Sequence, residues 1–168
     1  MRVLVIPDIH LKPWIFDRAI AFVVDYPDTL WCYGNHDVSY SWGRLESGYS
    51  PYAERTVMSK LEELENSLKS PAQINIMHRI DNVLFSHGGL TTDFLKWFNE
   101  DLLDADIDDV IAVVNDAPHD YLWNDESPLW FRPQYETREI FRADIYKQGK
   151  YVIIRICQQL YFSDTLFS

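Results

Sequence analysis

The stretch TLWCYGNHD, Thr29 to Asp37, joins a short apolar run to a glycine, an amide, an imidazole and a carboxylate on consecutive residues. Apolar runs of this length are typical of buried strands, and glycine is a residue at which strands end. A strand holds its last residues rigidly, and Gly34 supplies the backbone freedom for a sharp turn. The stretch therefore predicts a strand whose end projects three polar side chains into one site.

Two other predicted strands end in the same way. The apolar run Val3–Ile6 is followed by Asp8 and His10, and the run VLFS is followed by His87. In α/β sheets, ligand-binding groups gather where strands end, because the loops converge at that edge. The candidate site residues at the three strand ends are Asp8, His10, Asn35, His36, Asp37 and His87.

These side chains have the chemistry of a metal site. Carboxylate, imidazole and amide oxygen together suit divalent ions such as Mn, Fe, Zn, Ni or Mg, and no thiolate cluster is present. Asp8 and His10 lie two residues apart, so both would face one way in an extended strand. Taken singly, each candidate also has a structural explanation as a turn residue, a surface histidine or a helix cap.

Strand and helix patterns alternate along the chain, which predicts an α/β layered domain. The expected helices are Ile15–Val24, Pro51–Leu68, Thr92–Leu103, one that the acidic run Asp104–Asp109 opens and that continues through Val114, and Glu136–Tyr146. The expected strands are Val3–Ile6, Thr29–Tyr33, Ile74–Arg79, Asn82–Phe85 and Lys150–Cys157. Ser39–Tyr52 and Pro118–Pro133 are expected to be loops, the second pinned by its aromatic residues. With 168 residues and no linker, the chain is expected to form a single domain, 1–168.

Composition limits the partners and the compartment. The 26 acidic and 15 basic residues give a net charge of -11, which makes nonspecific nucleic-acid binding unfavourable. No signal peptide or membrane span is expected. Cys32 and Cys157 each lie in an apolar run, so we expect reduced, buried thiols and a cytoplasmic location. Oligomeric state cannot be inferred from these features.

The motifs DIH, GNHD and SHGG, each after a predicted strand and in this order, resemble the calcineurin-like metallophosphoesterase family. The stretch HDYLWNDESPLWFRP is also similar to bacterial and phage phosphoesterases of that family. The resemblance implies a β-sandwich flanked by helices, here shortened, with two metal ions at the strand ends and a phosphomonoester or phosphodiester substrate. It implies that Asp8 and His10 bind the first ion and that Asn35 and His87 bind the second. It further implies that His36 is the catalytic acid and that Asp37 orients its ring.

The implied chemistry is physically consistent with an acidic protein. Two cations about 3.5 to 4 Å apart can bind a phosphate between them, lower the pKa of a bridging water and neutralise charge as the phosphoester is displaced. Bound cations also invert the local field, so an anionic substrate can still bind.

Two motifs of the family are not found in this sequence. One is a GD motif, for which Asp25 is a poor match because Val24 precedes it; the other is GHxH, and no histidine follows His119. Each ion would then keep about two protein ligands, whereas catalytic zinc sites usually have about three plus water. The alternative function is therefore a degenerate, catalytically impaired domain that acts as a binding module. A third possibility is an interaction module that uses the Trp-rich loop.

The remaining polar and aromatic candidates are interpreted as mainly structural. His78 lies within a predicted strand and His119 within the aromatic loop. Trp123 and Trp130 either anchor that loop or line a substrate entrance, and Arg132 is a candidate phosphate contact.

Overall fold

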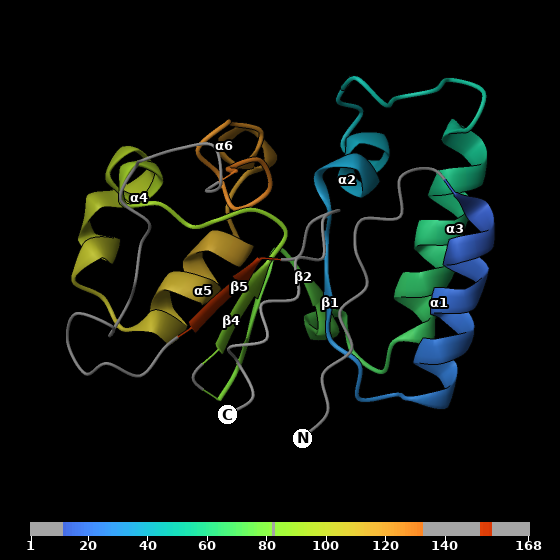
Figure 1. Cartoon of the computed structure of the whole chain (residues 1–168), viewed down its shortest axis with the longest axis horizontal. Helices are drawn as coiled ribbons and strands as arrows, with labels where there is room; N and C mark the ends of the chain where they lie inside the picture. Colours follow the sequence, from blue (N-terminus) through green and yellow to red (C-terminus); the bar gives the residue numbers. More distant parts are fainter. Residues whose placement is uncertain (1–11, 82, 133–151, 156–168) are drawn as a thin grey trace, which may run out of the picture.

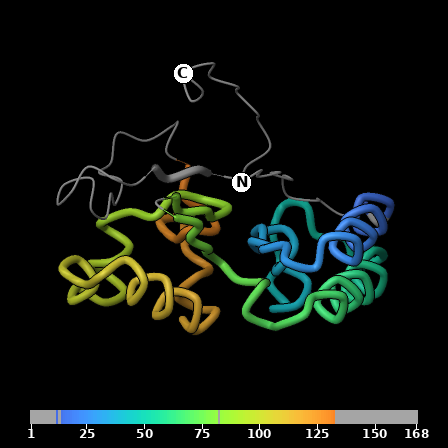
Figure 2. The backbone as a smooth tube through the Cα atoms, turned by 90° about the horizontal axis from the view of Figure 1, so that it is seen from below, coloured from blue at the N-terminus to red at the C-terminus, as the bar shows by residue number. Residues whose placement is uncertain are grey.

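Two groups of helices flank a set of short strands (Figure 1). The structure is a computed structural model that describes residues 12–81, 83–132 and 152–155 of the chain. The predicted strand Val3–Ile6, the predicted helix Glu136–Tyr146 and Cys157 lie outside the described residues. The described part is a mixed α/β protein with six α-helices and two small sheets. Figure 2 shows the helices of the first half on one side of the strands and those of the second half on the other.

The first half of the chain forms a helical pair beside a two-stranded parallel sheet. Helix α1 (Pro13–Asp25) packs against α3 (Glu54–Ser67), and β1 (Trp31–Cys32) pairs with β2 (Ile74–Asn75). Proline at the first position of α1 suits a helix start, because its missing N–H has no partner there in any helix. The core of this half consists of Phe16, Ala19, Ile20, Val23, Trp31, Tyr40, Val57, Leu61, Leu64, Leu68 and Ile74. The buried residues of α1 and α3 recur every three to four positions, which is the apolar spacing that predicted both helices.

The second half builds a three-stranded sheet. Strands β3 (Met77–Ile80) and β4 (Val83–Ser86) form an antiparallel hairpin, and β5 (Val152–Arg155) pairs in parallel with β4. Asp81 makes the turn with a φ of 53°, a left-handed conformation that Asp tolerates better than most residues. The hairpin and the strand between Lys150 and Cys157 agree with the expected elements, but the single strand expected over Ile74–Arg79 is divided into β2 and β3, which belong to different sheets.

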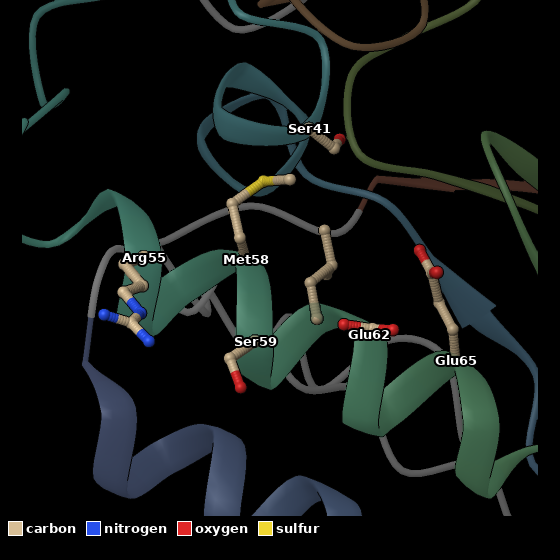
Figure 3. Close-up of a pocket in the computed structure, with 7 residues that line it drawn as sticks. Ser41, Arg55, Met58, Ser59, Glu62 and Glu65 are labelled. Atoms are coloured by element: carbon tan, nitrogen blue, oxygen red, sulfur yellow. The ribbon is translucent and has the colours of Figure 1, made fainter.

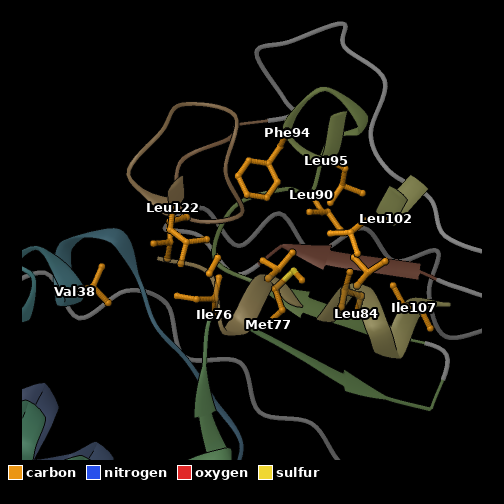
Figure 4. Close-up of a cluster of buried hydrophobic side chains, with 14 residues drawn as sticks. Val38, Ile76, Met77, Leu84, Leu90, Phe94, Leu95, Leu102, Ile107 and Leu122 are labelled. Carbon is orange, nitrogen blue, oxygen red and sulfur yellow. The ribbon is translucent and has the colours of Figure 1, made fainter. Parts of the chain in front are cut away.

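Helices cover the three-stranded sheet and its edges. They are α4 (Thr92–Asn99) with a 3₁₀ turn (Glu100–Leu103), α5 (Ile107–Asn115) and α6 (His119–Leu122). The core that they share with the strands is drawn in Figure 4 and consists of Val38, Ile76, Met77, Leu84, Leu90, Phe94, Leu95, Leu102, Ile107, Val110, Val114, Ala117, Leu122 and Leu129. The single helix expected over Thr92–Leu103 therefore ends early and tightens into a 3₁₀ turn, where the Asn99 side chain accepts from the amide of Asp101.

Helix α5 confirms the interpretation of the acidic run. Asp106 is its N-cap residue and Asp108 and Asp109 lie in its first turn, where carboxylates complement the helix dipole. At the other end, Asn115 holds α5 to the hairpin: its amide accepts from Met77 N and donates to Met77 O, both at 2.9 Å. These two hydrogen bonds satisfy the backbone N–H and C=O of Met77 at the start of β3, as a neighbouring strand would.

Side chains of β1 and β3 join the two halves. His78 Nε2 donates to the carbonyl oxygen of Trp31 at 2.8 Å, and Cys32 Sγ donates to Phe85 O at 3.6 Å. The structural interpretation of His78 is thus confirmed. Cys32 is half-buried and not fully buried as expected, and desolvation raises the pKa of its thiol to about 12, so the free thiol stays protonated. The contact with Phe85 places the ends of β1 and β4 side by side.

Two segments differ from the loops expected from composition. Helix α2 (Asn35–Ser41) starts inside the GNHD motif, so the prediction of a loop from Ser39 was wrong for its first three residues. The helix continues because Tyr40 is buried in the core of the first half. In the second segment, α6 precedes an irregular stretch in which Trp123 and Trp130 pack edge to face with ring centroids 5.0 Å apart. Both indoles are half-buried, which confirms their role as anchors.

In the part of the chain that the structure describes, no helix combines the length and the apolar character needed to cross a bilayer.

Candidate functional site

Asn35 is the first residue of α2 and follows the end of β1. Gly34 is its N-cap, and the carbonyl oxygen of Gly34 accepts the first two helical hydrogen bonds, from Asp37 N and Val38 N, both at 3.1 Å. The turn buries Asn35 so that 1% of the residue is exposed. Within the described residues neither Oδ1 nor Nδ2 of its amide makes a hydrogen bond. A buried amide without partners costs free energy, which marks Asn35 as a side chain available to a ligand.

The imidazole of His36 meets a carboxylate from outside the motif. His36 Nδ1 lies 2.9 Å from Oε1 of Glu46, close enough for an ion pair although the two atoms are not aligned as a hydrogen bond. The side chains are 14% and 3% exposed. The second oxygen of Glu46 accepts from the backbone N–H of Gly48 at 2.8 Å. Glu46 could not be identified from the sequence, because it lies in an irregular segment with no periodic pattern.

Asp37 is engaged at the start of the helix. Its Oδ2 accepts from the backbone N–H of Gly34 at 3.4 Å, as in a capping box, and its charge complements the N-terminus of α2. The carboxyl group is buried. Asp37 was expected to orient the ring of His36, whereas the carboxylate that lies 2.9 Å from Nδ1 in the structure is Glu46.

His87 follows β4 directly and is buried, with 3% exposed. Its loop is fixed on both sides. Ser86 Oγ donates to Gly88 O at 2.6 Å, and the amide of Gly88 donates to Pro128 O. A Cβ on Gly88 would lie 2.8 Å from Pro128 O, so only glycine allows this close approach of the aromatic segment. The SHGG motif is thereby held in place by the Trp-rich stretch.

One contact links the two predicted strand ends that the structure describes. Because Cys32 contacts Phe85, the segments that carry Asn35 and His87 leave neighbouring strand ends. Asp8 and His10 lie outside the described residues. Among the residues that are described, no group of three or more His, Cys, Asp or Glu side chains is arranged to hold a metal ion. An amide oxygen and an imidazole are nevertheless ligands that suit a divalent ion, so the donor chemistry of Asn35 and His87 fits such a group.

The other candidates make structural contacts. The guanidinium of Arg132 donates to the carbonyl oxygen of Trp130 at 2.8 Å. The ring of His119 stacks on Trp42 with centroids 4.0 Å apart, and desolvation lowers its pKa, assisted by the charge of Arg44. These contacts confirm that His119 supports the fold, while a role of Arg132 in phosphate binding stays a prediction.

A separate pocket of about 460 Å³ lies between α3 and the end of α2 (Figure 3). Its described lining residues are Ser41, Arg55, Met58, Ser59, Leu61, Glu62 and Glu65, and none of them belongs to the candidate set. Glu65 also accepts a hydrogen bond from Tyr33 at 2.6 Å, and burial together with this carboxylate raises the pKa of the tyrosine. The described lining of the pocket thus comes from α3 and from Ser41 at the end of α2, and not from the residues of the motif.

Comparisons of the chain with protein-family models, with curated proteins and with solved structures found no match.

Proposed function

We propose that the chain is a metal-dependent phosphoesterase of the calcineurin-like type, with its α/β elements arranged as a shortened β-sandwich flanked by helices. The observation that carries the proposal is Asn35, whose amide is buried at a strand end without a hydrogen bond to any described residue. The DIH, GNHD and SHGG motifs support it from the sequence. Composition favours action in the cytoplasm, on a phosphomonoester or phosphodiester.

The proposal gives each residue a role. Asn35 and His87 would hold one divalent ion through amide oxygen and imidazole, and Asp8 and His10 would hold another. Bound ions would supply charge neutralisation and a water of lowered pKa. His36 would protonate the leaving oxygen, and this role fits an imidazole that has a carboxylate at Nδ1. Asp37 keeps the first turn of α2, which presents Asn35 and His36, in place.

The second candidate is a binding module with the same fold and an impaired site. It is favoured by the ligand set, because the motifs supply about two protein ligands for each ion whereas a catalytic zinc site usually has about three. In this case one ion would bind weakly, and hydrolysis would be slow.

Hydrolysis of an aryl phosphate monoester and of a bis-aryl phosphodiester, with and without Mn²⁺, separates the two candidates. The phosphoesterase should show manganese-dependent turnover that His36→Ala lowers by about 100-fold or more, the scale of a lost general acid. His119→Ala is the matched control, because this ring lies in another element and should leave turnover unchanged. Equal rates in wild type and His36→Ala would refute the enzyme. Calorimetry that finds two tight Mn²⁺ sites would argue against the impaired module.

A further inference from the structure

We infer that Glu46 is the positioning residue of His36, and that it fixes the tautomer and the orientation of the imidazole in the proposed reaction. The inference rests on the proposed function for its catalytic meaning, but the pairing itself is a property of the folded chain. It replaces the expected role of Asp37, whose carboxylate accepts the amide of Gly34 at the start of α2.

The side chains of His36 and Glu46 lie close together. Oε1 of Glu46 lies 2.9 Å from His36 Nδ1, and the carboxylate side chain is only 3% exposed. A buried carboxylate is costly unless charged or polar groups compensate it. The groups that do so here are the ring of His36 and the backbone that follows Glu46.

The carboxylate of Glu46 is held in place by its own segment. Oε2 of Glu46 accepts from Gly48 N at 2.8 Å and from the hydroxyl of Ser47 at 3.3 Å. One oxygen is thus tied to the backbone while the other faces the ring. A Cβ on Gly48 would lie 2.9 Å from both His36 Nδ1 and Glu46 Oε1, so the absence of a side chain at Gly48 makes room for the pair.

The segment that supplies Glu46 is anchored to α2 through Tyr40. Tyr40 of α2 accepts a hydrogen bond from Ser50 N at 2.8 Å, and its ring stacks on Tyr49 with centroids 4.7 Å apart. The amide of Tyr49 in turn donates to Glu46 O at 3.0 Å. The helix that carries His36 therefore also anchors the segment that carries its carboxylate, which is the arrangement expected of a preorganised site.

The chemical consequence concerns the two ring nitrogens. A carboxylate oxygen 2.9 Å from Nδ1 attracts a proton on that nitrogen, which favours the Nδ1–H tautomer and makes Nε2 the nitrogen that exchanges a proton with a substrate. A carboxylate in this position also restricts rotation of the ring. Both effects act on the turnover of bound substrate more than on its binding.

Kinetics of Glu46→Ala and Glu46→Gln test the inference. With Mn²⁺ and the aryl phosphate that wild type hydrolyses, Glu46→Ala should lower kcat by about 10- to 100-fold, the usual loss for a partner of this kind, with little change in KM. Glu46→Gln should retain part of the rate, because its amide oxygen can take the place of Oε1 beside Nδ1. Glu62→Ala, an exposed carboxylate on α3, is the control and should match wild type. A Glu46→Ala enzyme with wild-type kcat would overturn the inference.

A second measurement does not depend on activity. The ¹⁵N shifts of the His36 ring, recorded without metal at about pH 9, where an ordinary imidazole is neutral, report which nitrogen carries the proton. Wild type should show the Nδ1–H tautomer, and both Glu46→Ala and Gly48→Ala should lose it, the second by inserting a methyl group against the pair. Unchanged ring shifts in folded Glu46→Ala would overturn the pairing. An inactive wild type that retains the Nδ1–H signature would refute the proposed enzyme and leave the pairing supported.

Discussion

Replacement of Asn35 by leucine should stabilise the metal-free protein. The amide of Asn35 is 1% exposed and makes no hydrogen bond to the described residues, so the fold bears the desolvation cost of two polar atoms. Leucine has a similar shape, and it is a good helix former for the first turn of α2. A structural asparagine would show the opposite effect on substitution.

The magnitude follows from the cost of an unpartnered buried amide, which is about 1 to 3 kcal/mol in mutational data. For a chain of this length, about 3 °C of Tm corresponds to each kcal/mol, so Asn35→Leu should raise Tm by about 3 to 9 °C. Asn115→Leu is the matched control. Asn115 makes two hydrogen bonds with Met77 at 2.9 Å, and their loss should lower stability by about 1 to 3 kcal/mol.

Thermal and urea unfolding with and without Mn²⁺ test this reasoning. At a Mn²⁺ concentration 100 times its Kd, the wild type should gain about 2.7 kcal/mol, whereas Asn35→Leu, which lacks a ligand oxygen, should gain less. The stability advantage of Asn35→Leu over wild type would then shrink or reverse when Mn²⁺ is added. A metal-free Asn35→Leu protein that is less stable than wild type would refute the view that this amide is held for a ligand.

Two further predictions concern the support of the site. Gly88→Ala should destabilise the protein by about 1 to 3 kcal/mol, because the added Cβ would lie 2.8 Å from the rigid Pro128 carbonyl oxygen. Gly43→Asn is the control and should be nearly neutral, because Gly43 has a φ of 62° and open space around it. Equal urea midpoints for the two variants would contradict the packing argument. Desolvation by burial lowers the pKa of His78 in the folded protein. As the pH falls below about 6.5, this histidine is therefore protonated in the unfolded chain before it is protonated in the folded protein. The folded protein should lose stability below that pH. In urea unfolding, His78→Gln should lose less stability than wild type between pH 8 and pH 5.5. His119→Gln, which replaces an exposed ring, should alter this pH dependence less. A His78→Gln variant that loses as much stability as wild type over that range would disprove the prediction.

Local patterns in the sequence were sufficient for the helices. Helices α1, α3 and α5 lie where apolar spacing placed them, because each buries one face against the rest of the chain and that face repeats every three to four residues. The acidic residues at the start of α5 could also be predicted from local sequence, because the dipole of a helix depends only on its own backbone. Composition was a weaker guide after the GNHD motif, where α2 forms in a segment expected to be a loop.

The candidate site was predictable in part. The motifs indicated that Asn35, His36 and His87 follow strands, and in the structure they do. The partner of His36 was not predictable from the motif, because Glu46 reaches the ring across an irregular segment that Tyr40 anchors. Successive residues of a helix do not face each other, so Asp37, which follows His36 in the first turn of α2, is not the carboxylate beside Nδ1 of its ring.

The sequence by itself determined the amphipathic helices, the strand ends and the kinds of polar groups that follow them, because these depend on residues a few positions apart. Only the tertiary structure decided that the end of β1 meets β4, that the amide of Asn35 is enclosed without a hydrogen bond to any described residue, and that Glu46 meets His36. These features depend on contacts between segments far apart in the chain, which form only when the side chains between them pack and the loops close.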